Sequence, residues 1–298
     1  MSTPIADLNR RPNLFGRIVK TLQNFWRVAP LSFLGGCLLA ILFFVAIFGN
    51  FLAPESHTLT DYKRIREPPT LNRPLGSDHL GRDALSRIII GSRTSLFIAF
   101  AAVFLAKLIG VTWGTVSGYR GGKFDLLSQR FLDVLMAIPT VIFALLLLAA
   151  IGSGVLGVII AITVGSIAGT TRIVRAVVLS VKEMEFVTAA ESLGASPLRI
   201  MLRHVAPQTV APILVIVSAS LGGAIFAESA LSFLGLGIPP PNPSWGAMLG
   251  GTLAEAFKPP WWMVFYPGLA ITLTILSFNL FGDGLRDTLD PRLRGRLD

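Results

Sequence analysis

An all-α integral membrane protein with about six transmembrane helices is the fold class that the sequence predicts, and three observations carry this prediction. Hydrophobic residues make up 52% of the 298-residue chain and charged residues only 14%, whereas soluble domains are about 25% charged. The mean hydropathy is +0.67, so apolar residues are not confined to one core. Several uncharged stretches also reach the ~20 residues that a helix needs to cross about 30 Å of hydrocarbon.

The first two predicted spans follow from stretches that lack charge. Residues 28–54 carry no charge, which places the first transmembrane helix at 31–53. The second is expected at about 94–118, where Lys107 is the one charged residue. The intervening residues, 54–93, are expected to form an extracytoplasmic loop.

The remaining spans come from three further apolar stretches. Residues 134–171 carry no charge and are too long for one crossing. Gly152-Ser153-Gly154 near their middle is a turn signal, which predicts a hairpin of the third and fourth spans. The fifth and sixth spans are expected at about 209–231 and 263–281. The chain is thus divided into a cytoplasmic segment 1–30, the helix and loop already given, a core transmembrane domain 94–284 of five helices with a loop at 172–208, and a cytoplasmic tail 285–298.

The distribution of basic residues predicts the orientation, because cytoplasmic loops carry an excess of Lys and Arg. Seventeen of these residues lie on the side of both termini and eight on the other side. Both termini are therefore expected in the cytoplasm. The segment 54–93 fits the rule poorly, since it holds seven basic residues, but five acidic residues lie among them. Long loops and paired charges can escape the rule.

The loop between the fourth and fifth spans carries the most specific local signals. Ala189 and Ala190 allow close helix packing, and Gly194 suits the left-handed end of a helix. Ser196 followed by Pro197 is typical of an N-cap with proline at the first helical position. The pattern predicts two short helices joined at a sharp bend.

The second of these short helices is expected to end at Pro207, because proline breaks helices. It presents an apolar stripe with two arginines beside it. A soluble partner could hold such an exposed element, or the helix could lie on lipid headgroups. The stripe consists of Leu198, Met201 and Leu202, and the arginines are Arg199 and Arg203.

Four blocks of sequence resemble the permeases of ABC importers. TAAESLG at 188–194, with Pro207 thirteen residues later, is similar to the EAA loop of these permeases. The other blocks resemble the dipeptide/oligopeptide/nickel family of binding-protein-dependent transport inner-membrane components. These blocks are GSDHLGRDALSRIIIGSRTSL at 76–96, SFLGLGIPPPNPSWGAML at 232–249 and FNLFGDGLRDTLDPRLR at 278–294. The similarity covers nearly everything after residue 30.

The resemblance implies a type I ABC importer permease fold and the permease subunit of an ATP-driven importer for peptides or related small solutes. It implies that a homologous permease completes the translocation pathway in the lipid of a prokaryotic inner membrane. Two ABC ATPase subunits would use the ATP, and an extracytoplasmic solute-binding protein would deliver the cargo.

The resemblance also implies that this EAA-like loop docks in a cleft of an ATPase subunit. The implied ATPase-coupling residues are Thr188, Ala189, Ala190, Gly194, Ser196, Pro197 and Pro207. Thr188 stands where the family pattern has an acid, and His204 stands where it has a branched apolar residue. The Ala-Ala-Gly geometry is kept, but position 188 lacks the charge for a salt bridge.

Other functions are disfavoured by missing residue patterns. Gly121-Gly122-Lys123 is followed by Phe124 and lacks the Ser or Thr of a phosphate-binding loop, so the chain is expected to bind no ATP or other cofactor itself and to be no enzyme. No metal site is expected, since its three histidines and one cysteine lack ligand spacing. The net charge of +9 is dispersed between apolar blocks, which argues against nucleic-acid binding.

Two charged residues fall within predicted spans, Lys107 and Glu228. Such residues normally face a bundle interior or water, so both are candidates for lining the pathway or facing the partner permease. Burial of Lys107 against protein and an interfacial position for Glu228 are the alternatives. Lys107 and Glu228, as a charge relay, also support a rival function, which is that of an ion-coupled secondary transporter or channel without ATPase partners.

The residues do not distinguish between peptide, nickel, glutathione and glycoside cargo. In the family that the chain resembles, selectivity rests largely with the binding protein.

Overall fold

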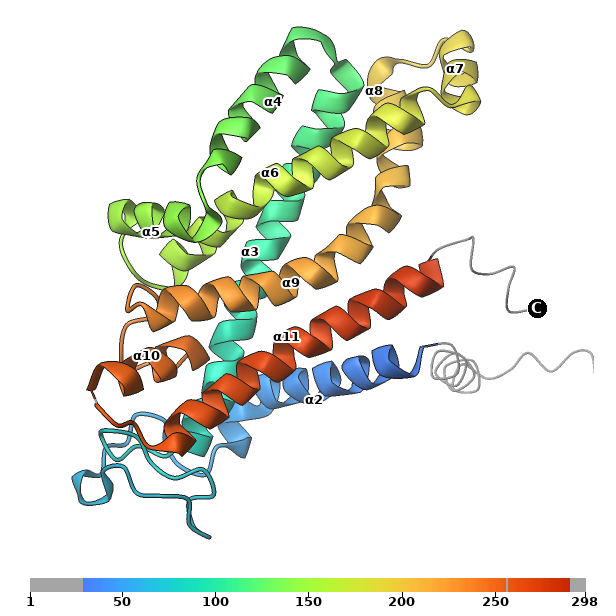
Figure 1. Ribbon diagram of the computed structural model, residues 1–298. Helices are drawn as coiled ribbons and strands as arrows, with labels where there is room; N and C mark the ends of the chain where they lie inside the picture. Colours follow the sequence, from blue (N-terminus) through green and yellow to red (C-terminus); the bar gives the residue numbers. More distant parts are fainter. Residues whose placement is uncertain (1–28, 256, 290–298) are drawn as a thin grey trace, which may run out of the picture.

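The computed structural model describes residues 29–255 and 257–289, and these residues form a helical bundle (Figure 1). Most of the expected segment 1–30, and the expected tail beyond residue 289, lie outside the described residues. The α-helices are α2 (Pro30–Leu52), α3 (Ala84–Arg120), α4 (Gly122–Ala137), α5 (Thr140–Ile151), α6 (Val155–Lys182), α7 (Glu185–Ser192), α8 (Pro197–Ile200), α9 (Val210–Phe233), α10 (Trp245–Glu255) and α11 (Trp261–Leu289).

Among the described residues, five stretches of helix are each long and apolar enough to cross a membrane, and α4 with α5, bent by 91° at their break, brings the number to six when this pair is counted as one broken span. The predicted all-α fold with about six spans is thereby confirmed. Ile138 separates the two halves in an extended conformation, and Pro139 precedes α5. A residue before proline is disfavoured in the helical region, which explains the position of the break.

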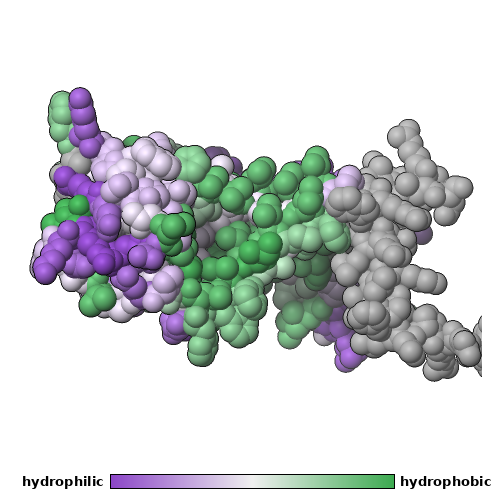
Figure 2. All heavy atoms as spheres, turned by 90° about the horizontal axis from the view of Figure 1, so that it is seen from below, coloured by the Kyte–Doolittle hydropathy of each residue, from purple (hydrophilic) through white to green (hydrophobic). Residues whose placement is uncertain are grey.

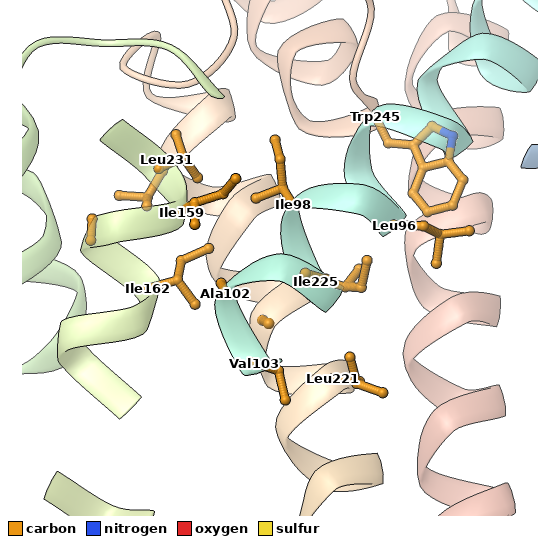
Figure 3. Packing of buried hydrophobic residues seen from close by; sticks show 14 of the residues in the cluster. Leu96, Ile98, Ala102, Val103, Ile159, Ile162, Leu221, Ile225, Leu231 and Trp245 are labelled. Carbon is orange, nitrogen blue, oxygen red and sulfur yellow. The ribbon is translucent and has the colours of Figure 1, made fainter. Parts of the chain in front are cut away.

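The bundle is built around α3, which packs most extensively against α6 and also contacts α9. Figure 3 shows Ile98 and Ala102 of α3 between Ile162 of α6 and Ile225 of α9. The last helix, α11, packs against both α2 and α9. The core is therefore made where α3 passes between the other long helices.

The outer surface of the helices is apolar. Phe51, Phe104 and Ile47 are large side chains that stand exposed on α2 and α3. Figure 2 shows hydrophobic residues over the helices and hydrophilic residues gathered at one end of the molecule. Such a surface suits lipid or other membrane helices, because apolar patches this large are rare on soluble proteins.

The two ends of the bundle differ. The start of α2, the end of α11 and the short helices α7 and α8 lie at one end, here called the α7 end (Figure 1). Residues 53–83 and α10 lie at the other, here called the outer end. Residues 53–83 contain a single short helical turn, η2 (Tyr62–Arg64).

The helix that contains the second expected span is longer than that span, because α3 begins ten residues before Thr94, at Ala84. The carboxylate of Asp83 caps this helix by accepting the Ser86 amide at 2.7 Å. Within the added turns, Arg87 is buried and pairs with Asp78 at 3.4 Å. A charged residue that is paired in this way is compatible with a continuing helix.

The fourth expected span likewise lies in a longer helix, since α6 continues beyond residue 172 to Lys182. Arg172 forms an ion pair with Asp133, and the Arg175 Nε donates to the Asp125 Oδ1 at 2.6 Å. Both acids belong to α4. These pairs neutralise the arginines, so the helix extends past them.

Candidate functional site

The bend after α7 has the geometry that its sequence predicts. Gly194 adopts a φ of +77°, a conformation that favours glycine. Its amide donates to the Glu191 carbonyl at 2.9 Å, and the Ala195 amide donates to the Ala190 carbonyl at 3.1 Å. These two bonds form the Schellman motif, which closes the end of a helix and turns the chain sharply.

The start of α8 also follows the prediction in position. Ser196 is the N-cap residue and Pro197 the first helical residue. The Ser196 carbonyl accepts the Ile200 amide at 3.0 Å, but the Ser196 side chain makes no capping bond. The backbone and Pro197 therefore set this helix start.

Pro207 does not end the second short helix, so that expectation is wrong. The chain continues from α8 through a π-helical turn at Met201–Val205 and a 3₁₀ turn at Ala206–Thr209 directly into α9. Proline has no amide to donate, and an ordinary helix would lose a bond there. The π turn shifts the pattern, since the Ala206 amide donates to the carbonyl of Met201, and so accommodates the proline.

The two short helices stand on a buried apolar foot. Val187 of α7 and Ile200 of α8 are almost completely buried. They pack with valines of the last turns of α6 in one cluster, and Ala190 lies against it. This cluster, called here the foot, consists of Val174, Val178, Val181, Val187, Ile200 and Val205. It joins the short helices firmly to α6.

Three leucines in and next to these short helices are exposed. Leu193 is 88% exposed, Leu198 61% and Leu202 57%. Thr188 and Ala189 are also exposed. The Thr188 carbonyl accepts a bond from the Ser192 hydroxyl at 3.0 Å. The three leucines, called here the leucine face, give a soluble partner an apolar surface to bind.

The foot is connected to the rest of the bundle through a close contact of α6 with α3. Three glycines at four-residue spacing on α3 face α6. A Cβ at Gly110 would lie 2.7 Å from the Thr170 Cβ, and one at Gly118 would lie 3.0 Å from the Val178 Cγ1. The absence of side chains lets the two backbones approach, as in membrane helix pairs with small residues at this spacing. The Lys182 Nζ adds a bond to the Tyr119 carbonyl at 2.9 Å.

Lys107, the first of the two charged candidates, lies far inside α3. Its Nζ donates to the Thr170 hydroxyl of α6 at 2.9 Å. The side chain is half-buried and lines a cavity of about 310 Å³ beside the break between α4 and α5.

Glu228, the second candidate, is completely enclosed near the outer end of α9. Its Oε1 accepts the Ser232 hydroxyl at 2.7 Å. Glu228 lines neither the cavity beside Lys107 nor a larger one of about 600 Å³ at the outer end. The two charges are thus not brought together.

The sequence raises paired charges for the segment 54–93 but does not identify which residues form the ion pairs of the outer end. The Arg82 Nε donates to Asp78 at 2.6 Å, and Arg87 approaches the same carboxylate. Arg73 pairs with Glu55 at 2.7 Å. Asp78 and Arg82 are four residues apart in the block at 76–96, and this spacing was the available signal. In the described part of the chain, no group of His, Cys, Asp or Glu is placed to hold a metal ion.

Residues 110–295 match the family described as "Binding-protein-dependent transport system inner membrane component". The chain is 39% identical to the dipeptide transport system permease protein DppC of Bacillus subtilis (strain 168), with 97% of this chain and 90% of that protein covered. It is 41% identical to the glutathione transport system permease protein GsiD of Escherichia coli O1:K1 / APEC, with 97% of each covered.

Among solved structures, the chain is similar to one from inward-facing conformations of the MetNI methionine ABC transporter. The TM-score is 0.58 at 16% sequence identity, and the match covers 69% of this chain and 97% of that chain. At this identity the likeness bears on the fold, which is that of a type I ABC importer permease.

Proposed function

The chain belongs to the family of binding-protein-dependent transport system inner membrane components, and from this premise we propose how it works and with which partners. It is a multi-pass membrane permease subunit of an ATP-driven ABC importer, and this family is one of transport subunits and not of enzymes. We propose that it shares the translocation pathway with a homologous permease. Two ABC ATPase subunits use the ATP, and an extracytoplasmic solute-binding protein delivers the cargo.

The ATPase binds the leucine face. The single observation that supports this best is the bend at Gly194, which holds an exposed apolar surface on a buried foot. Burying an exposed leucine contributes roughly 1.5–3 kcal/mol, so Leu193, Leu198 and Leu202 offer substantial binding energy to a cleft of matching shape. Thr188, Ala189, Ala190, Ser196, Pro197 and Pro207 shape this coupling element.

Movement of the ATPase is transmitted through the foot to α6. Because α6 contacts α3 along Gly110, Gly114 and Gly118 and is ion-paired to α4, a pull on α7 and α8 displaces these helices together. A rigid-body movement of this kind switches access to a pathway from one side of the membrane to the other.

The orientation follows from the same assignment. The α7 end faces the cytoplasm with both termini, and residues 53–83 face the opposite side, where the binding protein docks. The ion pairs of Arg73, Arg82 and Arg87 support this placement, since paired basic residues resist translocation less than free ones. The chain is then divided into 1–30, 31–53, 54–83, 84–284 and 285–298. The end of the outer loop thus moves from residue 93 to residue 83, directly before the start of α3.

The cargo is a small peptide. The two similar permeases carry names that refer to dipeptide and glutathione transport, and both of these solutes are short peptides. Lys107 lines the pathway because it borders a cavity between spans. The enclosure of Glu228 supports a role in fixing the outer end of α9. An ion-coupled transporter without ATPases, the rival function, is not favoured by the relatives.

Purification in mild detergent tests this proposal. We expect the chain to co-purify with a second permease and with ATPase subunits, and the reconstituted complex to take up peptide only with ATP and the binding protein. A chain that purifies alone and transports peptide without ATP would refute it.

A further inference from the structure

The ammonium of Lys107 lies near the middle of the membrane domain. Lys107 is far from both ends of α3, Ala84 and Arg120. Its hydrogen-bond partner, Thr170, is likewise in the central part of α6. A charged side chain at the centre of a span is unfavourable by roughly 2.5–3.5 kcal/mol on insertion scales, so its retention calls for a compensating interaction.

That compensation is incomplete within the described part of this chain. Lys107 donates to a neutral hydroxyl, and no carboxylate among the described residues lies within 4.0 Å of its Nζ. The two arginines of α6 differ in this respect, because Arg172 and Arg175 each have an acidic partner on α4. Lys107 therefore retains the capacity to bind an anion.

The cavity beside Lys107 has room for such an anion. Its volume is about 310 Å³, at the lower end of the range of roughly 300–1,000 Å³ for small-molecule sites. The hydroxyl-bearing residues Thr140, Ser166 and Ser220 and the ring of Phe143 contribute to its lining. Hydroxyls beside an apolar wall suit the polar backbone and the side chain of a short peptide.

The break between α4 and α5 forms one wall of this cavity, since Ile138 and Thr140 contribute to its lining. Thr140, the first residue of α5, borders the cavity, and no side chain caps this helix start. The unpaired amides of a helix start carry partial positive charge. This partial charge adds to the positive electrostatic potential of the Lys107 ammonium, which is the main charge of the cavity.

We propose that this cavity is a transient cargo site in which the Lys107 ammonium holds a free carboxylate of a peptide. The inference rests on the proposed function and deepens it, because it names the chemical group of the cargo that the permease itself recognises. Two other anions, a lipid phosphate and an acidic side chain of the partner permease, are less suited to the site. Lipid phosphates lie at the membrane surface, whereas Lys107 is central, and a partner side chain would leave the hydroxyl-lined volume unused.

The experiment uses the complete importer, reconstituted in phosphatidylcholine nanodiscs without nucleotide or binding protein. Cys37, the free cysteine of this chain, is replaced by serine, and Ser220→Cys places a thiol in the cavity wall. Methyl methanethiosulfonate, a neutral reagent, labels this thiol, and intact mass of the chain counts the label. The probes are dialanine and dialanine amide, which differ in the free carboxylate.

With Lys107 present, we expect dialanine to protect the thiol at about one tenth of the concentration that dialanine amide requires, as a charged hydrogen bond predicts. Lys107→Met should make the two concentrations equal, and Lys107→Arg should retain the preference. Lys123→Met, which removes an exposed lysine of α4, is the matched control and should leave the preference unchanged.

Three results would overturn the inference. They are equal protection by the two probes with Lys107 present, a preference that survives Lys107→Met, and a thiol that the reagent never labels. A thiol protected without peptide when phosphatidylglycerol replaces phosphatidylcholine would assign the site to lipid and also overturn it. ATP-dependent uptake by the same complex separates the two proposals, because it persists if this inference alone fails and is absent if the proposed function fails.

Discussion

Gly114 of α3 lies so close to Val174 of α6 that a Cβ at position 114 would be 2.9 Å from the valine Cβ. The Thr171 carbonyl would be nearer still, at 2.6 Å. Val174 belongs to the foot on which α7 and α8 stand. The contact thus links the coupling element to the centre of the bundle without an intervening side chain.

Gly114→Ala should therefore lower the stability of the folded protein. Because backbone lies on the other side of the contact, the helices must separate, and overpacking of this kind destabilises by roughly 1–3 kcal/mol. Thermal unfolding of the purified complex, followed by tryptophan fluorescence, should show a lower midpoint. Gly223→Ala on α9 is the matched control, since nothing lies within 4 Å of a Cβ there. Equal midpoints for the two variants would contradict the close contact.

The leucine face gives a second prediction. Leu198→Asp should release the ATPase subunits, because it places a charge in the proposed apolar interface and removes roughly 1.5–3 kcal/mol of burial. The fold should persist, since Leu198 is exposed and lies outside the foot. Co-purification measures the loss, and Leu71→Asp, a change at an exposed leucine of the outer end, should retain the ATPases. Retention by both variants would place the ATPase contact elsewhere.

A third prediction concerns the ion pairs of the outer end. Asp78→Asn keeps the size of the side chain but leaves the buried Arg82 and Arg87 without their acid. Breaking a buried pair by removing one partner destabilises by roughly 3–5 kcal/mol, so proteolysis of the segment 53–83 should accelerate strongly. Asp61→Asn breaks an exposed pair with Arg64 at 3.5 Å and should change stability by less than about 1 kcal/mol. Similar proteolysis rates for the two would show that Asp78 does not hold this segment together.

The features that sequence could predict are local ones. The apolar lengths of the spans decide their number, because the bilayer imposes one length on every helix. Gly194 and Pro197 determine the bend and the helix start through their own backbone preferences. The structure has the bend and the helix start at these positions, because neither feature depends on contacts with distant residues.

The features that sequence could not predict depend on contacts between distant residues. Arg172 looked like the end of a span, but Asp133 pairs with it and α6 continues to Lys182. Pro207 looked like a helix end, but the π turn before it accommodates the missing amide. The cavity beside Lys107 is lined by residues of α3, α4, α5, α6 and α9 together, so no single sequence motif predicts it.

The most direct test of the account is ATP-dependent peptide uptake by the reconstituted importer carrying Gly194→Pro. Proline cannot adopt the φ of +77° and removes the amide that donates to Glu191, so the angle between α7 and α8 should change. We expect uptake to fall to background while the chain remains inserted and thermally stable, and Gly194→Asn, which tolerates this conformation, to retain uptake. Unchanged uptake in the proline variant would contradict the claim that this bend couples the permease to its ATPase.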